Sequence, residues 1–163
     1  LRAAGVNHLV GVPDRVTAAL WQCFAEDRTA RVITACREGE AVGICGGLYL
    51  AGHRPLFCVK NFGLFESLDT LRMLAVDFGT PLLMFIGHEG RPRPGLAEEL
   101  RARLGNDAVS QVVLAGLWTT RILQAIDVAH YSVHNGDAAL VARRAAQQAT
   151  AESRPVALLG ELP

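Results

Sequence analysis

The chain lacks the features that mark several large classes of protein. No apolar run approaches the roughly 20 residues that a membrane-spanning helix needs, so we expect no membrane segment. Lysine plus arginine and aspartate plus glutamate each number 16, and this balance argues against a nucleic-acid binder driven by charge. The glycine-rich phosphate loop, the G-x-G-x-x-G fingerprint and the G-x-S-x-G elbow are all missing. Neither nucleotide binding nor a serine hydrolase is therefore supported.

The spacing of cysteine and histidine also argues against a metal site. The four cysteines form no C-x-x-C pair and lie in apolar phrases, as free thiols in a reducing compartment do; they are Cys23, Cys36, Cys45 and Cys58. His130 and His134 would point to the same face of a strand, but no third ligand lies near them in the sequence. We expect a cytoplasmic protein with no metal site of its own.

What the chain does have is a large apolar content for its size. Half of the 163 residues are hydrophobic and the mean hydropathy is slightly positive. This length is most simply one domain, 1–163, with enough residues to bury a substantial core. The apolar excess predicts an interface with another chain. Because the numbering begins inside a helical phrase, we also expect the natural protein to start further upstream.

Apolar runs alternate with amphipathic segments along the chain. We predict strands at 8–12, 31–36, 55–59, 81–87, 130–134 and 155–159, and helices at 16–26, 36–52, 65–78, 96–104, 119–126 and 137–152. The segment 107–117 is apolar and fits either a strand or a helix. The alternation predicts a three-layer αβα fold, in which a doubly wound, mainly parallel sheet of about six strands has helices on both faces.

In such a sheet the ligand crevice lies at the carboxyl ends of the strands. Polar or glycine-bearing exits follow the first three strands, at 11–14, 36–38 and 60–63, and we expect them to converge there.

The segment 36–52 is the most unusual helix in the prediction. It contains Gly39, Gly43, Gly46, Gly47 and Gly52. Each interior glycine costs a helix roughly 1 kcal/mol relative to alanine, so we expect that another backbone or a flat ligand comes very close.

Glu38, in the first turn of this helix, is the strongest candidate for chemistry. The structural alternative is that it merely complements the helix dipole, which is worth under about 1 kcal/mol. Glu40 fits that role better, and the crevice position of Glu38 favours a functional one. Asp14 is expected to be the N-cap of the helix at 16–26 first and a site residue second.

Four phrases in order carry a resemblance to a known family: GVPD, REGEAVGICGGLYLAGHRP, NFGLFESLDTL and PLLMFIGHEG. They resemble the pyrimidine-binding domain of thiamine-diphosphate-dependent 2-oxoacid decarboxylases, and most of all that of the sulfopyruvate and phosphonopyruvate decarboxylases. The similarity covers roughly the first 90 residues and the last strand. The segment 95–128 carries no recognisable motif.

The resemblance implies a role for Glu38. In that family the corresponding glutamate hydrogen-bonds N1′ of the cofactor's aminopyrimidine and promotes the imino tautomer, which takes the proton from the thiazolium C2. The cofactor-binding residues implied beside it are Pro13, Asp14, Asn61, Phe62, Gly63 and Leu64.

The resemblance also implies that this chain holds half of an active site. The family binds the diphosphate and its Mg²⁺ with a second domain that carries a G-D-G motif, and this sequence has no such motif. We therefore expect a homo- or hetero-oligomer with a subunit that carries the diphosphate-binding domain, acting on a small 2-oxoacid.

Some positions depart from the family pattern and leave the substrate open. Phe62 and Phe65 stand where small residues are usual, and Arg15 stands where serine is common. An anionic substrate tail would need cations, and the candidates, each of which could equally be solvated, are Arg15, Arg37, Lys60 and Arg91. Two alternatives remain at this point: a non-catalytic homologue that regulates or scaffolds, and an unrelated doubly wound binding domain whose glycines serve packing alone.

Overall fold

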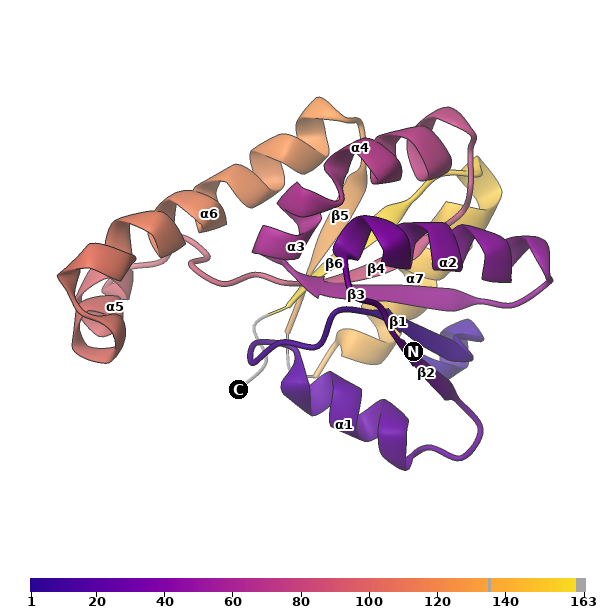
Figure 1. Cartoon of the computed structure of the whole chain (residues 1–163), viewed down its shortest axis with the longest axis horizontal. Helices are drawn as coiled ribbons and strands as arrows, with labels where there is room; N and C mark the ends of the chain where they lie inside the picture. The colour runs from indigo at the N-terminus through magenta and orange to yellow at the C-terminus, as the bar shows by residue number, and fades with distance from the viewer. Residues whose placement is uncertain (135, 161–163) are drawn as a thin grey trace.

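A single six-stranded sheet runs through the molecule. The computed structural model describes residues 1–134 and 136–160, so the last residues of the expected domain, 161–163, and residue 135 lie outside it. The strands are β1 (His8–Gly11), β2 (Arg31–Thr34), β3 (Pro55–Lys60), β4 (Leu83–Gly87), β5 (Ala129–Val133) and β6 (Val156–Gly160). Every neighbouring pair is parallel, in the order β2-β1-β3-β4-β6-β5 (Figure 1). The fold predicted from the alternation is confirmed.

Helices cover both faces of this sheet. One face carries α2 (Glu38–Leu50), α3 (Asn61–Glu66), α4 (Leu68–Leu71), the π-helix η2 (Arg72–Asp77) and the end of α6 (Asn106–Ala125). The other face carries the 3-10 turn η1 (Arg2–Ala4), α1 (Ala18–Glu26) and α7 (Ala138–Glu152). The remaining helix, α5 (Leu96–Leu104), packs on the first half of α6, and together they project from the body of the molecule (Figure 1).

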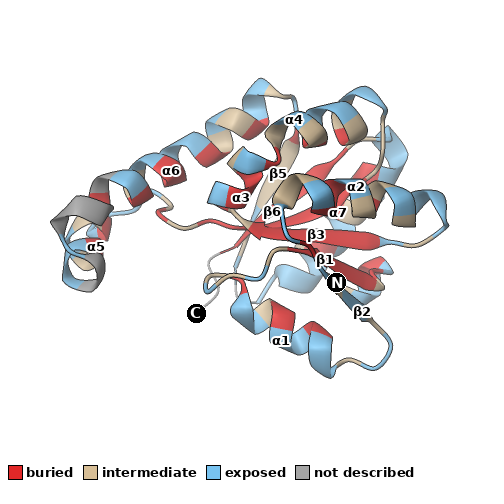
Figure 2. Ribbon diagram, in the orientation of Figure 1, coloured by how far each residue is buried: buried red, intermediate tan, exposed pale blue. Residues whose placement is uncertain are grey.

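Two hydrophobic cores follow from the alternation of side chains along the strands. Val10, Phe57 and Met84 point toward the α2 side, whereas Leu9, Leu56 and Phe85 point toward the α1 and α7 side. The four inner strands β1, β3, β4 and β6 are buried on both faces, while β2 and β5 form the more exposed edges (Figure 2). Burial on both faces explains why the inner strands read as continuous apolar runs.

Two helix predictions need correction. The helix expected at 65–78 starts earlier, at Asn61, because the chain turns directly from β3 into α3 at Lys60; it then continues as α4 and a π-helix. The ambiguous segment 107–117 is helical and is continuous with the helix expected at 119–126, so both belong to α6.

Gly116 lies in the middle of α6 for a steric reason. A Cβ built on Gly116 would lie 1.8 Å from the carbonyl oxygen of Gly90 in the loop after β4. The loop and the helix therefore touch backbone to backbone at this point, which only glycine permits.

Gly11 ends β1 under a similar constraint and gives a test of the fold. A Cβ at this position would lie 1.9 Å from the carbonyl oxygen of Cys58 in β3, and neither strand can move aside in the centre of the sheet. We predict that Gly11→Ala lowers the free energy of unfolding by at least about 2 kcal/mol, in the range of overpacked cores. Urea unfolding of the isolated chain measures this loss.

Gly43→Ala is the matched control. A Cβ on Gly43 meets nothing within 4 Å, and the residue is exposed on α2. The same glycine-to-alanine change should keep the stability or raise it by up to about 1 kcal/mol, because alanine is the better helix former. Equal losses in the two variants would contradict the packing argument.

Candidate functional site

The N-terminus of α2 packs against α3 through Glu38 and Gly63. Glu38 is the first residue of α2 and is half-buried. A Cβ on Gly63 would lie 2.7 Å from Cγ and 2.8 Å from Oε1 of Glu38. The Glu38 carboxyl group thus rests on the bare backbone of α3, at a position where any other residue would displace it.

Within residues 1–134 and 136–160, the Glu38 carboxylate takes no hydrogen bond and no ion pair, whereas the acids around it are engaged. Glu40 Oε2 accepts a hydrogen bond from the backbone N–H of Cys36 (2.9 Å). Glu66 accepts the N–H of Gly39 at one oxygen (2.8 Å) and bonds to the guanidinium of Arg37 at the other (2.7 Å). Glu40 and Glu66 therefore stabilise the start of α2, and the Glu38 carboxylate is left available to a ligand.

Asn61 connects α3 to two other elements from a fully buried position. Its Nδ2 donates to the carbonyl of Glu89 (2.8 Å) and to Oγ1 of Thr119 in α6 (3.2 Å), and Thr119 donates in turn to the carbonyl of Ala115 (2.8 Å). Its Oδ1 is buried and has no hydrogen-bond partner in the described part of the chain. Asn61 therefore joins the loop after β4 and α6 to the site, and keeps one acceptor unused.

Asp14 does not form the N-cap of the helix that follows. That helix starts at Ala18, and its N-cap residue is Thr17. Asp14 instead closes the turn before it: Oδ1 accepts the backbone N–H groups of Val16 (2.6 Å) and Thr17 (3.2 Å), and Oδ2 accepts the Thr17 hydroxyl (2.7 Å). Both carboxylate oxygens are used inside the protein, while the neighbouring Pro13 is exposed in the loop after β1.

The two side chains that flank Gly63 differ in burial. Leu64 is fully buried in the core beneath α2, so only its backbone can face a ligand. The Phe62 ring is 37% exposed and lies 6.2 Å from the ring of Phe65, tilted by 55°. Phe62 is thus an apolar surface one residue away from the glycine that supports Glu38.

Most of the candidate cations for an anionic substrate are already paired. Arg15 Nη2 lies 3.0 Å from Oε1 of Glu89, and Lys60 Nζ lies 3.7 Å from Oε2 of the same residue. Arg37 pairs with Glu66 at 2.7 Å. Arg91 makes no ion pair with any residue that the structure describes.

Glu66, Glu89 and Thr119 are site residues that sequence reasoning missed. Glu89 follows a buried strand at its carboxyl end, which is a weak signal, and Glu66 and Thr119 carry none. Their partners lie far away along the chain, so only the fold brings them together.

His130 and His134, for which the sequence offers no third metal ligand, border different hollows. His130 borders a hollow lined by Gln124, Tyr131 and Arg154, whereas His134 borders a larger cavity that is described below. In the described ranges, no group of three or more histidine, cysteine, aspartate or glutamate residues could hold a metal ion. None of the helices there is both long and apolar enough to cross a membrane.

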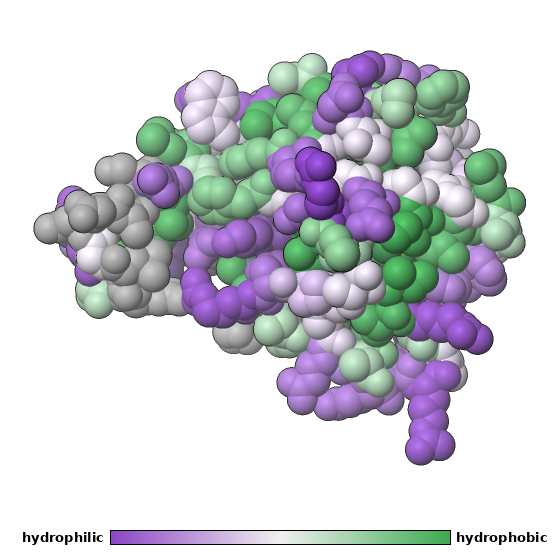
Figure 3. Space-filling view, viewed as in Figure 1, coloured by the Kyte–Doolittle hydropathy of each residue, from purple (hydrophilic) through white to green (hydrophobic). Residues whose placement is uncertain are grey.

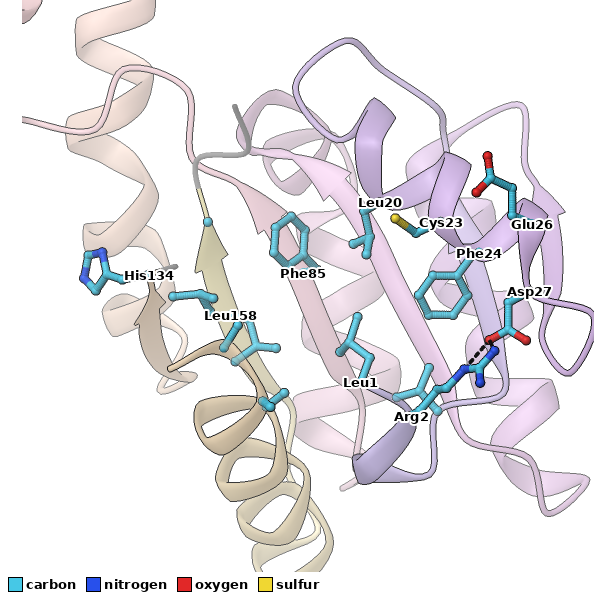
Figure 4. Close-up of a pocket in the computed structure, with 16 residues that line it drawn as sticks. Leu1, Arg2, Leu20, Cys23, Phe24, Glu26, Asp27, Phe85, His134 and Leu158 are labelled. Atoms are coloured by element: carbon cyan, nitrogen blue, oxygen red, sulfur yellow. Dashed lines mark hydrogen bonds and ion pairs between the residues drawn. The ribbon is translucent and has the colours of Figure 1, made fainter. Parts of the chain in front are cut away.

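A large cavity lies away from Glu38, on the opposite face of the sheet. It has a volume of about 640 Å³ and opens between α1 and α7 over Phe85 of β4 and Leu158 of β6 (Figure 4). Its walls are mainly apolar, and the ion pair of Arg2 with Asp27 stands at its rim (Figure 4). Its described lining residues include no carboxylate without an internal partner that rests on a glycine backbone as Glu38 does on Gly63, so we keep the surroundings of Glu38, at the carboxyl ends of the strands, as the candidate site.

Curated relatives match this chain over nearly its whole length. It is 26% identical over 157 residues to the sulfopyruvate decarboxylase subunit alpha of Methanococcus maripaludis, a match that covers 96% of this chain and 86% of the relative. It is 28% identical over 160 residues to the same subunit of Methanocaldococcus jannaschii, covering 98% and 87%. A phosphonopyruvate decarboxylase of Streptomyces hygroscopicus is 29% identical over 92 residues, 56% of this chain and 23% of that protein. No family model matches. The chain is a homologue of sulfopyruvate decarboxylase alpha subunits.

Solved structures with the same fold are much longer than this chain. The benzoylformate decarboxylase of Polynucleobacter necessarius superposes with a TM-score of 0.70 at 22% identity, and the thiamine diphosphate-dependent 4-hydroxybenzoylformate decarboxylase of Rhodococcus jostii RHA1 with 0.72 at 17%. Each match covers 99% of this chain but only 28% of the other. This three-layer fold is therefore that of one domain of a thiamine-diphosphate-dependent enzyme.

The contacts of Glu66 predict how the stability of the site depends on pH. The hydrogen bond from Arg37, followed by that from the Gly39 N–H, holds the pKa of Glu66 below its ordinary value. The stabilisation is therefore complete above the unfolded-state pKa of about 4.3 and is lost as the pH falls through the lower folded-state pKa. Because the pair is partly exposed, we predict that Glu66→Gln lowers stability by under about 1 kcal/mol at pH 7.

The difference between the wild type and Glu66→Gln should shrink as the pH falls below about 4. Urea unfolding between pH 3 and 7 measures it. A difference that stays constant over this range would contradict the assignment of the pair.

Proposed function

We propose that this chain is the alpha subunit of a thiamine-diphosphate-dependent 2-oxoacid decarboxylase, in which it is a single pyrimidine-binding domain and Glu38 activates the cofactor's aminopyrimidine. The observation that carries the proposal is the half-buried Glu38 carboxylate, which rests on Gly63 and has no partner in the described part of the chain. Homology to alpha subunits, of which the chain spans 86–87%, supports it.

The residues around Glu38 fit an aminopyrimidine ring. A carboxylate on an uncovered backbone can exchange a proton with a ring nitrogen, because nothing inside the chain competes for it. Glu38 would hold that proton at the pyrimidine N1′, with Gly63 and the Phe62 ring beside it. The Pro13–Asp14 loop and the backbone of Leu64 would complete the border. When bound, thiamine diphosphate supplies the thiazolium that accepts the electron pair released as carbon dioxide leaves the 2-oxoacid.

The buried Asn61 would hold the start of α3 in place beneath Glu38 and Gly63. Through Glu89 and Thr119 it fixes the start of α3 to the loop after β4 and to α6, and so it fixes the backbone on which Glu38 rests. Its unused Oδ1 could accept one hydrogen bond from the ligand or from a water molecule.

A partner subunit would supply the other half of the site. We assign it the diphosphate and the Mg²⁺, since the sequence carries no G-D-G motif. Three glycines of α2 offer a place for it, because Cβ atoms on Gly43, Gly46 and Gly47 would each meet nothing within 4 Å. On the face shown in Figure 3, hydrophobic and hydrophilic residues lie side by side over the region of α2 and α3.

The first prediction from this proposal concerns Glu38. In the complex with a partner that carries the diphosphate-binding domain, Glu38→Gln should lower the rate of decarboxylation at least about 100-fold, as expected for loss of acid–base catalysis. Thiamine diphosphate should still bind in a saturable, Mg²⁺-dependent manner, which calorimetry measures.

Glu40→Gln is the matched control, because Glu40 lies in the same turn of α2 but bonds to the Cys36 N–H. It should retain activity within a few-fold. Near-normal activity of Glu38→Gln would refute the assignment of Glu38. A wild-type complex that takes up no cofactor would favour the non-catalytic alternative, a homologue that regulates or scaffolds.

A second prediction concerns the glycine face of α2. Gly43→Leu should leave the isolated chain at least as stable, because leucine is the better helix former by roughly 1 kcal/mol. The new side chain should nevertheless weaken the affinity for the partner at least about tenfold, since overpacking an interface costs 1 kcal/mol or more.

Gln147→Leu on α7 is the control, because it places the same apolar side chain at an exposed position on the opposite layer. Sedimentation or surface-binding measurements compare the two variants. Equal affinities of the two variants for the partner would contradict the placement of the interface on α2.

A further inference from the structure

We infer that the decarboxylase proposed above acts on 2-oxoacids whose side chain is apolar and uncharged, and that Phe62 forms the surface that receives this side chain. The inference rests on the proposed function. It goes beyond it by naming the substrate class, which differs from the anionic sulfopyruvate of the curated relatives' names.

The first argument is that the cations at the strand-end crevice are neutralised from within the chain. Arg15 and Lys60 share Glu89, whose side chain is only 15% exposed and which lies on the loop after β4. An anionic substrate tail would have to compete with this carboxylate for both cations. Arg37, the third candidate, is held by Glu66 in the same way.

The charge that remains suits a monoanion. Two cations and one carboxylate leave one net positive charge in the group formed by Arg15, Lys60 and Glu89. Every 2-oxoacid carries the carboxylate next to its oxo carbon, so this charge is matched before any tail is considered. A sulfonate or phosphonate tail would bring further negative charge with no free partner among these three residues.

Arg91 is the one candidate cation without an ion pair in the described ranges, and its backbone is fixed. A Cβ on Gly116 of α6 would lie 3.0 Å from the Arg91 nitrogen, so the chain at Arg91 lies against α6. Removal of the Arg91 side chain therefore tests the alternative that the site binds an anionic substrate tail.

The second argument is the apolar surface at the site. Phe62 immediately precedes Gly63, on which Glu38 rests, and its ring is 37% exposed. Lys60 Nζ lies 4.8 Å from the centre of this ring, and Phe65 packs beside it at 6.2 Å. The ring is thus held in place by its neighbours. An apolar tail gains by covering such a surface, whereas an ionised tail would lose its hydration without a replacement hydrogen bond.

The experiment compares substrates in the reconstituted complex with partner, thiamine diphosphate and Mg²⁺. We expect kcat/KM for phenylpyruvate to exceed that for sulfopyruvate at least about tenfold, the range in which a pocket separates side chains. Phe62→Ser should raise the ratio of KM for phenylpyruvate to KM for pyruvate by a similar factor, because any effect on the cofactor is common to both substrates and only phenylpyruvate has a tail that covers the ring. Phe78→Ser, at an exposed phenylalanine beyond η2, is the matched control and should leave this ratio unchanged.

Two further measurements do not depend on loss of activity. In the Glu38→Gln complex, which should bind substrate without turnover, calorimetry should detect phenylpyruvate and show weaker binding after Phe62→Ser. Glu89→Gln should improve the use of sulfopyruvate at least about tenfold, because it releases Arg15 and Lys60. This is a gain of function that misfolding cannot imitate.

The possible outcomes separate the two proposals. A complex that binds the cofactor, requires Glu38 and prefers sulfopyruvate, with Arg91→Ala abolishing that preference, overturns the inference and leaves the proposed function intact. If Phe62→Ser weakens the affinity for the partner without changing substrate preference, Phe62 is an interface residue and the inference also fails. A complex that binds no cofactor and decarboxylates no 2-oxoacid overturns both.

Discussion

The contact between the Glu38 side chain and the backbone of Gly63 is the constraint on which the site depends. It requires α2 and α3 to approach within van der Waals distance at their N-terminal turns, immediately after β2 and β3 end. The ion pair of Arg37 with Glu66 and the hydrogen bond from the Gly39 N–H to Glu66 close the same junction from its other side. A small shift of the α3 backbone would therefore both move Glu38 and loosen the start of α2. Asn61, the first residue of α3, limits such a shift because it is buried and hydrogen-bonded to Thr119 of α6.

The four glutamates around the candidate site have different tasks, and their partners show which task each has. Glu40 holds a backbone N–H, Glu66 joins two helices, and Glu89 neutralises two cations. Glu38 alone among these four has no partner in the ranges that the structure describes. A carboxylate can share a proton with an incoming base only if no internal donor already holds it, so the engagement of the other three is part of what makes Glu38 suitable.

Much of the fold could be predicted from the sequence, because strands buried on both faces must be continuously apolar and the intervening amphipathic segments must be helices. The start of α3 could not be predicted, because residues 61–64 resemble the polar exit of a strand in the sequence. They are helical in the structure, where Asn61 hydrogen-bonds to Glu89 and Thr119. Within the candidate site, Glu38 could be proposed from its position in a glycine-rich helix. Its support by Gly63 and the pairing of Arg15 and Lys60 with Glu89 could not, since those partners come from other loops. The glycines of α2 separate into two cases. Gly39 lies close to the side chain of Thr70 and not to the backbone or flat ligand that was expected, whereas Gly43, Gly46 and Gly47 face open space within the described chain.

The open glycine face of α2 and the incomplete burial of Glu38 both indicate that a second surface covers the site. Acid–base exchange between a carboxylate and a ring nitrogen is strongest where water is excluded, because water competes for both groups. Glu38 is only half-buried, and the cavity of about 640 Å³ lies across the sheet from it, between α1 and α7. The chain thus positions the carboxylate to which we assign the proton exchange but does not enclose it. Enclosure requires a second surface against α2 and α3, and a helix without side chains at Gly43, Gly46 and Gly47 lets that surface come as close as backbone contact permits. The glycines that weaken α2 as an isolated helix are therefore the feature by which an incomplete site can be closed.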